Sequence, residues 1–283
     1  MTTMSETAAD IEYQVLTTGL GRELLEHVAR VASPGPADLV RWRGMAPAEW
    51  VNAAIRLREG RRRASAKYRL ASEMWFDPVG LEQATAEVVA RYKAGRFRGR
   101  GVVDLCSGIG GDTLALAERG EVLAVDRDPG MNLRVRWNAR VYGVHDRVRP
   151  IRADAERFPI PPGFWVHVDP DRRAGTSRDR SNRASRIEDY RPGAAALKAL
   201  ARTVEGAAIK LSPASDFEAH FPGSDFEVEL ISLNGECKEA TIWSGAAATC
   251  SRRATRLPEG ITWTDRDADR DLVGNVPIPD ITP

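Results

Sequence analysis

Cysteine and histidine are scarce in this chain of 283 residues. The cysteines are odd in number, far apart and without any C-x-x-C pair; they are Cys106, Cys237 and Cys250. This spacing argues against both a disulfide framework and a zinc site. The four histidines are equally dispersed, at positions 27, 145, 167 and 220. We therefore expect no bound metal.

Long apolar runs are also missing. No stretch approaches the roughly 18 uncharged apolar residues that a membrane helix needs. The N-terminal sequence MTTMSETAAD has neither the basic nor the apolar region of a secretory signal. The composition, 42% hydrophobic and 29% charged, is that of an ordinary globular protein. The length fits one large or two modest domains, and we expect a cytoplasmic location.

Lysine is rare, with 5 lysines beside 36 arginines, and the 41 basic residues nearly balance the 40 acidic ones. A net charge of +1 excludes a polybasic protein that holds nucleic acid by bulk charge alone. The charge is unevenly distributed, because residues 1–200 carry a net +7 and residues 201–283 a net −6. A nucleic-acid partner would therefore meet positive charge in the first two thirds of the chain.

The first third has apolar residues at helical spacing. Between residues 13 and 69 the pattern breaks at 33–36 and 46–47, which predicts several short helices. Asp77-Pro78 then favours the start of a longer helix that continues to Gly95.

The middle third changes character, because short buried-strand runs alternate with helical segments. This alternation is typical of a parallel sheet covered by helices. The predicted strands are 101–105, 121–126, 147–152, 164–169 and 207–211, and the predicted helices are 113–119, 129–142 and 192–204. Beyond them, 226–233 and 240–243 flank Asn234-Gly235-Glu236, which predicts an antiparallel hairpin at the sheet edge. Residues 252–263 have the pattern of further strands.

The most informative segment is VVDLCSGIGGDT at 102–113, a strand that leads into a glycine-rich turn and a helix. Glycines let the backbone turn sharply and let a ligand approach closely. The next predicted strand ends at Asp126, sixteen residues after Gly110, where a carboxylate can accept both hydroxyls of a ribose. Turn and acid together predict a cofactor that contains a nucleoside. A nicotinamide cofactor is disfavoured, because its turn reads G-x-G-x-x-G and this one reads D-x-x-x-G-x-G-G.

This turn resembles motif I of the class I S-adenosylmethionine-dependent methyltransferases. The resemblance implies that Asp104 helps to hold the methionine amino group and that Asp126 binds the ribose. It also implies that Asp154 lies beside the adenine with the backbone of Ala155. Cys106 is interpreted as a small filler without a redox role. The implied cofactor-binding residues are Thr85, Asp104, Cys106, Ser107, Gly108, Gly110, Asp126, Arg127, Asp154 and Ala155.

Asp169 and Pro170 follow the fourth predicted strand, where amino methyltransferases carry Asn or Asp, Pro, Pro and then an aromatic residue. In those enzymes the acid or amide accepts hydrogen bonds from the target amine. Here Arg172 stands at the aromatic position, and a planar guanidinium can stack on a base or bind phosphate. The predicted catalytic residues are therefore Asp169, Pro170 and Arg172. The alternative is that Asp169-Pro170 only ends the strand and that Arg172 and Arg173 lie in solvent.

A wider set of segments is similar to the methyltransferases that contain a THUMP-like domain, which are related to the trimethylguanosine synthases that methylate guanine N2 of an RNA cap. These segments are 67–68, 74–77, 81–85, 138–144, 169–173 and 235–240. The similarity implies that the helix near Asp77 packs over the cofactor, and we interpret Trp75 and Phe76 as core residues of that helix. The expected fold is an α/β, Rossmann-like class I methyltransferase sheet, mostly parallel, behind an N-terminal all-helical domain.

The expected domains are a helical domain at 1–70, a connecting helix at 71–100, a methyltransferase domain at 101–248 and the start of a truncated THUMP-like element at 249–283. We predict methyl transfer from S-adenosylmethionine to RNA, on a base such as guanine N2. An Arg-rich surface supports this partner, formed by Arg56, Arg58, Arg61, Arg62, Arg63 and the loop 172–191. Two alternatives stay open: a methyltransferase of a small molecule or protein, and a non-catalytic module that binds the cofactor or RNA.

Overall fold

A single mixed sheet forms the centre of the computed structural model, which describes residues 6–171 and 187–267. Its strand order is β3-β2-β1-β4-β5-β7-β6-β8-β9. The first five strands of this order are parallel to one another, whereas β7 is antiparallel to both β5 and β6. The chain reverses its direction of winding between β1 and β4, and such a switch point opens a crevice at the carboxyl ends of the strands.

The strands follow the sequence pattern closely. They are β1 (Val102–Leu105), β2 (Val122–Asp126), β3 (Val148–Arg152), β4 (Trp165–Val168), β5 (Gly206–Leu211), β6 (Phe226–Leu233), β7 (Glu236–Gly245), β8 (Arg252–Leu257) and β9 (Ile261–Thr264). The hairpin of β6 and β7 is antiparallel as predicted, but it does not lie at the sheet edge, because β8 and β9 continue the sheet beyond β6. Asn234 and Gly235 both have positive φ at its turn, 54° and 82°, as a two-residue hairpin requires.

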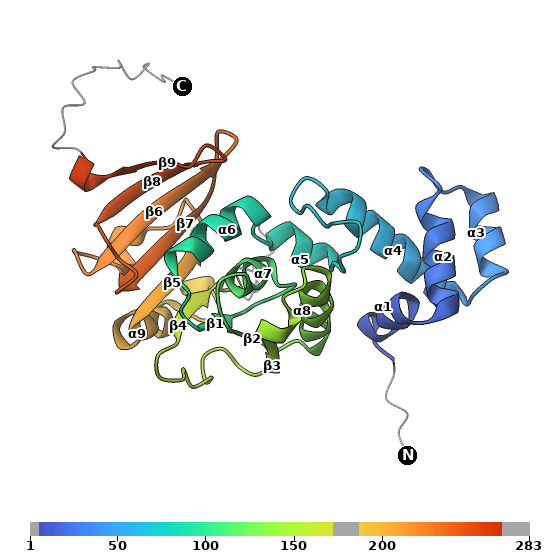
Figure 1. The fold of residues 1–283 in the computed structure, drawn as a ribbon, viewed down its shortest axis with the longest axis horizontal. Coiled ribbons are helices and arrows are strands. Elements are labelled where there is room, and N and C mark those ends of the chain that lie inside the picture. The colour runs from blue at the N-terminus through green and yellow to red at the C-terminus, as the bar shows by residue number, and fades with distance from the viewer. Residues whose placement is uncertain (1–5, 172–186, 268–283) are drawn as a thin grey trace.

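Helices cover both faces of the sheet and form a separate group at one end of the molecule (Figure 1). They are α1 (Ala8–Thr17), α2 (Gly19–Ala29), α3 (Pro36–Arg43), α4 (Ala48–Ala64), α5 (Pro78–Gln83), α6 (Glu87–Arg96), α7 (Gly111–Ala117), α8 (Pro129–Val141), α9 (Ala194–Thr203) and α10 (Phe217–His220), with short 3₁₀ turns at His145–Arg147, Ile187–Asp189 and Asp265–Asp267.

Alternate residues of each central strand face opposite layers of core. Val102 of β1 packs with apolar residues of α6, α7 and α8, whereas its neighbour Val103 packs with Leu197 and Ala201 of α9. Both layers are fully buried, which explains why the strands read as continuous apolar runs rather than as alternating ones.

The N-terminal helices α1 to α4 have their own core, which continues into the segment after α4. Trp42 and Trp75 are completely buried in it, and Phe76 is 3% exposed, so both members of the pair Trp75–Phe76 are core residues. Buried Glu12 of α1 joins this group of helices to the sheet domain. Its carboxylate accepts hydrogen bonds from the Trp75 indole at 2.8 Å and from Arg134 of α8 at 2.9 Å.

The single helix predicted from Asp77 to Gly95 is wrong. The structure has two helices, α5 and α6, separated by an extended break at Ala84–Ala86. Lysine side chains cap the end of α5. Lys67 Nζ donates to the carbonyls of Leu81, Glu82 and Ala84. Lys210 Nζ donates to the carbonyl of Gln83. These long-range donors stabilise a break that local apolar periodicity does not reveal.

Strands β8 and β9 extend the same sheet. β8 pairs in parallel with β6, and β9 pairs with β8. The expected boundary at residue 248 therefore falls inside the sheet, and the strand pattern at 252–263 belongs to it. The assignment of 249–283 to a THUMP-like element stays a prediction, and residues 268–283 lie outside the described part.

Within residues 6–171 and 187–267, no helix is long and apolar enough to cross a membrane.

Candidate active site

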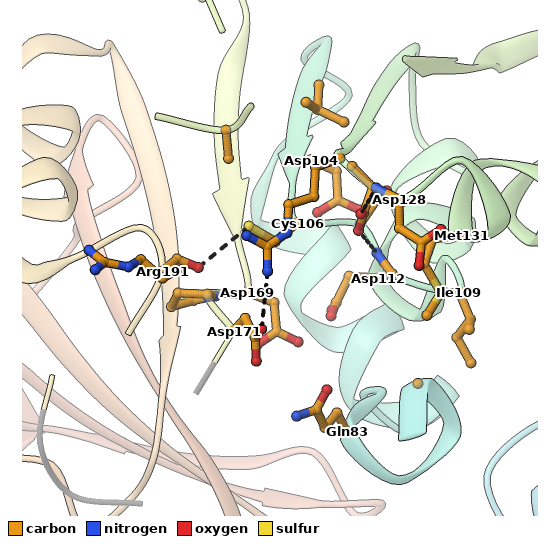
Figure 2. Close-up of a pocket in the computed structure, with 18 of the residues that line it drawn as sticks. Gln83, Asp104, Cys106, Ile109, Asp112, Asp128, Met131, Asp169, Asp171 and Arg191 are labelled. Atoms are coloured by element: carbon orange, nitrogen blue, oxygen red, sulfur yellow. Dashed lines mark hydrogen bonds and ion pairs between the residues drawn. The ribbon is translucent and has the colours of Figure 1, made fainter. Parts of the chain in front are cut away.

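A pocket of about 520 Å³ opens at the carboxyl ends of the parallel strands. A volume of this order accommodates a nucleoside-sized ligand. The loops after β1, β2, β3 and β4 line it from one side, and α5 with the break after it lines it from the other. Figure 2 shows acidic side chains from several of these loops converging on the same space. The expected crevice of an open α/β sheet is thus present.

Most of the predicted site residues line this pocket. They are Thr85, Asp104, Cys106, Ser107, Gly108, Asp126, Arg127, Asp154, Ala155, Asp169 and Pro170. Gly110 does not line it; with φ of 92° it forms the turn that starts α7. Arg172 lies outside the described residues.

The glycine-rich turn offers a ligand two features at the pocket wall: free space beside Gly108 and the hydroxyl of Ser107. No protein atom stands within 4 Å of the place where Gly108 would carry a Cβ, and its φ of +54° disfavours any side chain there. Ser107 is 8% exposed, and its Oγ has no hydrogen-bond partner among the described residues. Buried hydroxyls are normally satisfied, so an orphan hydroxyl in a pocket wall fits a ligand that supplies the partner. The turn therefore fits the expected cofactor.

Asp126 ends β2 at the pocket with its carboxylate fixed by two backbone amides. Gly108 N donates to Oδ2 at 3.0 Å, and Asp128 N donates to Oδ1 at 2.9 Å. Burial raises the pKa of Asp126 despite these two bonds. The position suits the predicted ribose contact, which stays a prediction, as does the adenine contact of exposed Asp154.

Asp104 has a different environment from the one that the sequence suggests. Its side chain is buried, and each oxygen already has a protein donor or partner. Thr113 Oγ1 donates to Oδ2 at 2.5 Å, and His167 Nδ1 lies 2.7 Å from Oδ1. Asp104 still lines the pocket, so a role at the methionine end stays a prediction, but its carboxylate is held from both sides.

Asp112 and Lys93 form a buried ion pair behind the same pocket. Lys93 Nζ of α6 lies 2.9 Å from Asp112 Oδ1 and 2.8 Å from Glu239 Oε1 of β7. Burial alone would raise the pKa of Asp112, but Lys93, then His167 and Lys210, hold it well below its usual value. Burial likewise opposes the charge of Lys93, and Asp112 and Glu239 nevertheless raise its pKa.

Lys210 of β5 connects the two sides of the pocket. Its Nζ donates to Thr85 Oγ1 at 2.9 Å, and Thr85 Oγ1 donates to Asp112 Oδ2 at 2.7 Å. It also donates to Asp169 Oδ2 at 2.7 Å and to the Gln83 carbonyl at 3.2 Å. An ammonium has three donors, so Lys210 is saturated. Asp169 is thus held through Oδ2, while Oδ1 has no donor among the described residues.

One further contact lies at the mouth of the pocket. Arg127 Nη2, in the loop after β2, is 3.7 Å from Oδ2 of Asp171, in the loop after β4. Burial, followed by the charge of Asp126, raises the pKa of the Cys106 thiol. Because the thiolate is the reactive form, Cys106 is unsuited to nucleophilic chemistry at neutral pH.

Sequence reasoning missed Asp112, His167 and Lys210. The signal was present for two of them, since His167 and Lys210 are polar residues in the otherwise apolar strands WVHV and GAAIKL. A buried charge must be paired, so a lysine in such a strand predicts a buried carboxylate nearby. The scarcity of lysine adds to this signal: three of the five lysines, at 67, 93 and 210, surround the pocket.

Comparison with known proteins places this architecture in a large group. A crystal structure from Porphyromonas gingivalis W83, described as a methyltransferase, superimposes with a TM-score of 0.63 and 20% sequence identity, over 89% of this chain and 68% of that one. The fold is that of a class I methyltransferase. This fold confirms the predicted mostly parallel sheet with its antiparallel edge and N-terminal helices.

Sequence comparison agrees with the fold. The family of RNA cap guanine-N2 methyltransferases matches residues 99–201. Two curated relatives from Mycobacterium tuberculosis, strains CDC 1551 and H37Rv, are called uncharacterized S-adenosylmethionine-dependent methyltransferases, and each is 33% identical over 202 residues. That match covers 70% of this chain and 54% of each relative, so the chain spans about half the length of the curated relatives it matches. The predicted class I methyltransferase fold is confirmed, and the names of both curated relatives give S-adenosylmethionine as their cofactor.

Proposed function

We propose that the protein transfers a methyl group from S-adenosylmethionine to an N–H group of an RNA base. The observation that carries the proposal is the arrangement of Asp169, which lines the pocket with Oδ2 fixed by Lys210 and with no donor to Oδ1 in residues 6–171 and 187–267. A carboxylate held in this way is an acceptor aimed by the protein, and an amine is the methyl acceptor that it can orient.

The cofactor supplies a methyl group on a sulfonium, which a nucleophile displaces in line. The protein's part is to hold the acceptor nitrogen in that line and to stabilise the positive charge that develops on it. Asp169 Oδ1 accepts a hydrogen bond from the acceptor N–H, and that bond strengthens as the nitrogen becomes cationic. The products are the methylated base, the thioether S-adenosylhomocysteine and one proton, which leaves the nitrogen for Asp169 Oδ1 and then for solvent. Lys210 keeps the carboxylate from rotating, because its ammonium is anchored on Thr85 and Gln83.

The match to the RNA cap guanine-N2 methyltransferases supports RNA as the substrate class and guanine N2 as the methylated atom. The exocyclic amine of guanine carries two N–H donors, and one of them suits Asp169. We further propose that the protein belongs to the group of methyltransferases with a THUMP-like domain, because segments 67–68, 74–77, 81–85, 138–144, 169–173 and 235–240 are similar to that group.

One observation favours the alternative of a smaller acceptor. The arginines of α4 that were expected to face RNA are engaged within the protein: Arg56 with Glu12, Arg62 with Glu59, and Arg61 with the carbonyls of Glu73 and Met74. Burial lowers the pKa of Arg61 to about 10. Of the five arginines at 56–63, Arg63 alone has no partner among the described residues, so this run presents less free charge than its composition suggests.

The test is to incubate the purified protein and methyl-labelled S-adenosylmethionine with cellular RNA, cellular protein or small molecules, each fraction in a separate reaction. We expect label in RNA, and nuclease digestion should place it on a base, with N2-methylguanosine as the first product to seek. The Asp126→Ala variant serves as the control that cannot hold the cofactor. Label confined to protein or small molecules would overturn RNA as the substrate class. Label in no fraction would overturn the proposed activity.

A further inference from the structure

His167 is a buried polar residue that none of the expected roles uses. It lies in the middle of β4, its side chain is 1% exposed, and it lines the cofactor pocket. Its Nδ1 is 2.7 Å from Oδ1 of Asp104 on β1. Thr113 takes the other oxygen of that carboxylate. The orientation of the motif I acid in the pocket wall therefore depends on a histidine from the neighbouring strand.

The opposite edge of the ring faces a group of charges. Nε2 lies 3.4 Å from Lys93 Nζ of α6 and 3.8 Å from Asp112 Oδ1 of α7. Phe97, directly after α6, packs edge-on against the ring, with the ring centroids 6.5 Å apart. Lys93 also pairs with Glu239 of β7. Asp112 accepts a hydrogen bond from Thr85, whose hydroxyl accepts one from Lys210 of β5.

The charges in this group do not balance. Among the described residues, Lys210 is paired with Asp169, which leaves the carboxylates of Asp104, Asp112 and Glu239 against the ammonium of Lys93. A protonated His167 leaves one negative charge uncompensated, and a neutral His167 leaves two. Uncompensated charge in a buried site is costly, and a cationic ligand relieves it. The sulfonium of S-adenosylmethionine is such a cation, and the thioether of S-adenosylhomocysteine is not.

We propose that His167 is a positioning residue for the cofactor. Its Nδ1 fixes Asp104, and the charge of its ring sets the preference of the pocket for the sulfonium over the thioether. The inference concerns the cofactor alone, so it is independent of which acceptor the protein methylates.

The direction of the pH dependence follows from the surroundings of the ring. Burial opposes the charged form, and Lys93 does too, but the carboxylates of Asp112 and Asp104 outweigh them and raise the pKa of His167 above 6.5. A bound sulfonium repels the ring proton, so S-adenosylmethionine binds more tightly as pH rises through this pKa. S-adenosylhomocysteine lacks that charge and depends less on pH. The ratio of the S-adenosylmethionine affinity to the S-adenosylhomocysteine affinity should therefore rise as the pH is increased from about 6 through the raised pKa of His167.

The experiment is titration calorimetry of the full chain with each ligand across this pH range. For the wild type we expect the ratio of affinities to rise about tenfold. His167→Asn and His167→Gln form a matched pair, because the Asn amide can replace Nδ1 toward Asp104, whereas the Gln amide reaches the position of Nε2. His167→Asn should retain affinity within about threefold at high pH, and His167→Gln should lose about tenfold or more.

In both variants the ratio of affinities should respond less to pH than in the wild type, since the titrating ring is gone. Titration of the ligand's own amino group is common to all three proteins and cancels in this comparison. Equal affinities in the two variants would overturn the positioning role. The same change of the affinity ratio with pH in the wild type and in both variants would overturn the electrostatic role.

Discussion

Helix α6 contributes one cation to each of two buried charge clusters, and the two clusters differ in what they leave unpaired. Lys93 belongs to the pocket cluster, formed by Lys93, Asp104, Asp112, His167, Asp169, Lys210 and Glu239. Arg96, one turn further on, belongs to the sheet cluster, formed by Arg96, Glu227, Glu229 and Arg253. Both lie in the interior; four members of the pocket cluster, at positions 104, 112, 167 and 169, line the pocket described above, and no member of the sheet cluster does.

The sheet cluster is saturated. Arg96 forks onto Glu227 with bonds of 2.7 and 2.8 Å and lies over the Trp243 ring at 3.9 Å. Glu229 accepts hydrogen bonds from Trp243, Tyr92 and Thr255 as well as from Arg96. Burial would raise the pKa of Glu227, but Arg96 and Arg253 lower it to about 2. With these oxygens satisfied by protein donors, the sheet cluster links α6 and β8 to β6.

The pocket cluster, in contrast, has an unsatisfied atom, because Asp169 Oδ1 has no donor among the described residues, and its carboxylates outnumber its cations. Ser107 Oγ, in the wall of the same pocket, also has no partner among the described residues. The comparison teaches that burial of charge alone does not mark a functional site in this fold. The distinguishing feature is incomplete satisfaction at a cavity, and substitutions in the two clusters should therefore separate stability from function.

The largest effect on stability is expected for Glu227→Gln. It leaves Arg96 and Arg253 without their shared counter-charge, and breaking a buried pair in this way costs about 3–5 kcal/mol of the free energy of unfolding. Chemical denaturation measures the loss. The affinity for S-adenosylmethionine should stay within about threefold of the wild type while the variant is folded. A stable variant with lost cofactor binding would contradict the division between the clusters.

Lys210→Met should have the reverse profile. Asp169 loses its anchor, and misplacement of an orienting group costs about 100-fold in the rate of methyl transfer. The free energy of unfolding should fall by less than in Glu227→Gln, because Asp169 borders the open pocket and can be solvated. Lys198→Met, on α9 and without an ion pair among the described residues, is the matched control. Rates are measured on the substrate fraction that accepts label, and an undiminished rate would refute the role of Lys210.

Ser107→Ala is expected to have the smallest effect. Removing a hydroxyl that bonds only to the ligand should weaken cofactor binding about three- to tenfold and leave stability nearly unchanged. Ser244→Ala is the matched control, because Ser244 Oγ in β7 is also buried and unpartnered but does not line the pocket. Calorimetry should find altered affinity in the first variant only. Equal affinities would mean that the hydroxyl of Ser107 is not a ligand contact.

The sequence predicts much of the fold because strand runs and glycine-rich turns are local signals. The strands β1 to β5, the hairpin of β6 and β7, and the helices α7 to α9 appear within a few residues of their expected places. The break between α5 and α6 is hidden, because Lys67 and Lys210 cap it from outside the segment. Local pattern cannot report a hydrogen bond that spans 127 residues.

The candidate site divides in the same way. Residues on the turns after the strands are predictable, since the topology brings strand ends together. The partners of Asp104 and Asp169 are not, because His167 and Lys210 meet them only across neighbouring strands. The sequence pattern predicts strands in the segment that forms β8 and β9. Their place in the sheet depends on the pairing of β8 with β6, which no local sequence pattern indicates.

The most direct test of the pocket as the cofactor site is calorimetric titration of S-adenosylmethionine into the wild type, Asp126→Ala and Arg253→Met. Wild-type affinity should be of micromolar order. Asp126→Ala should show no binding, because it removes the acceptor at the end of β2, and Arg253→Met should bind like the wild type, because it changes only the sheet cluster. Wild-type affinity in Asp126→Ala would contradict the account, since the cofactor would then lie elsewhere.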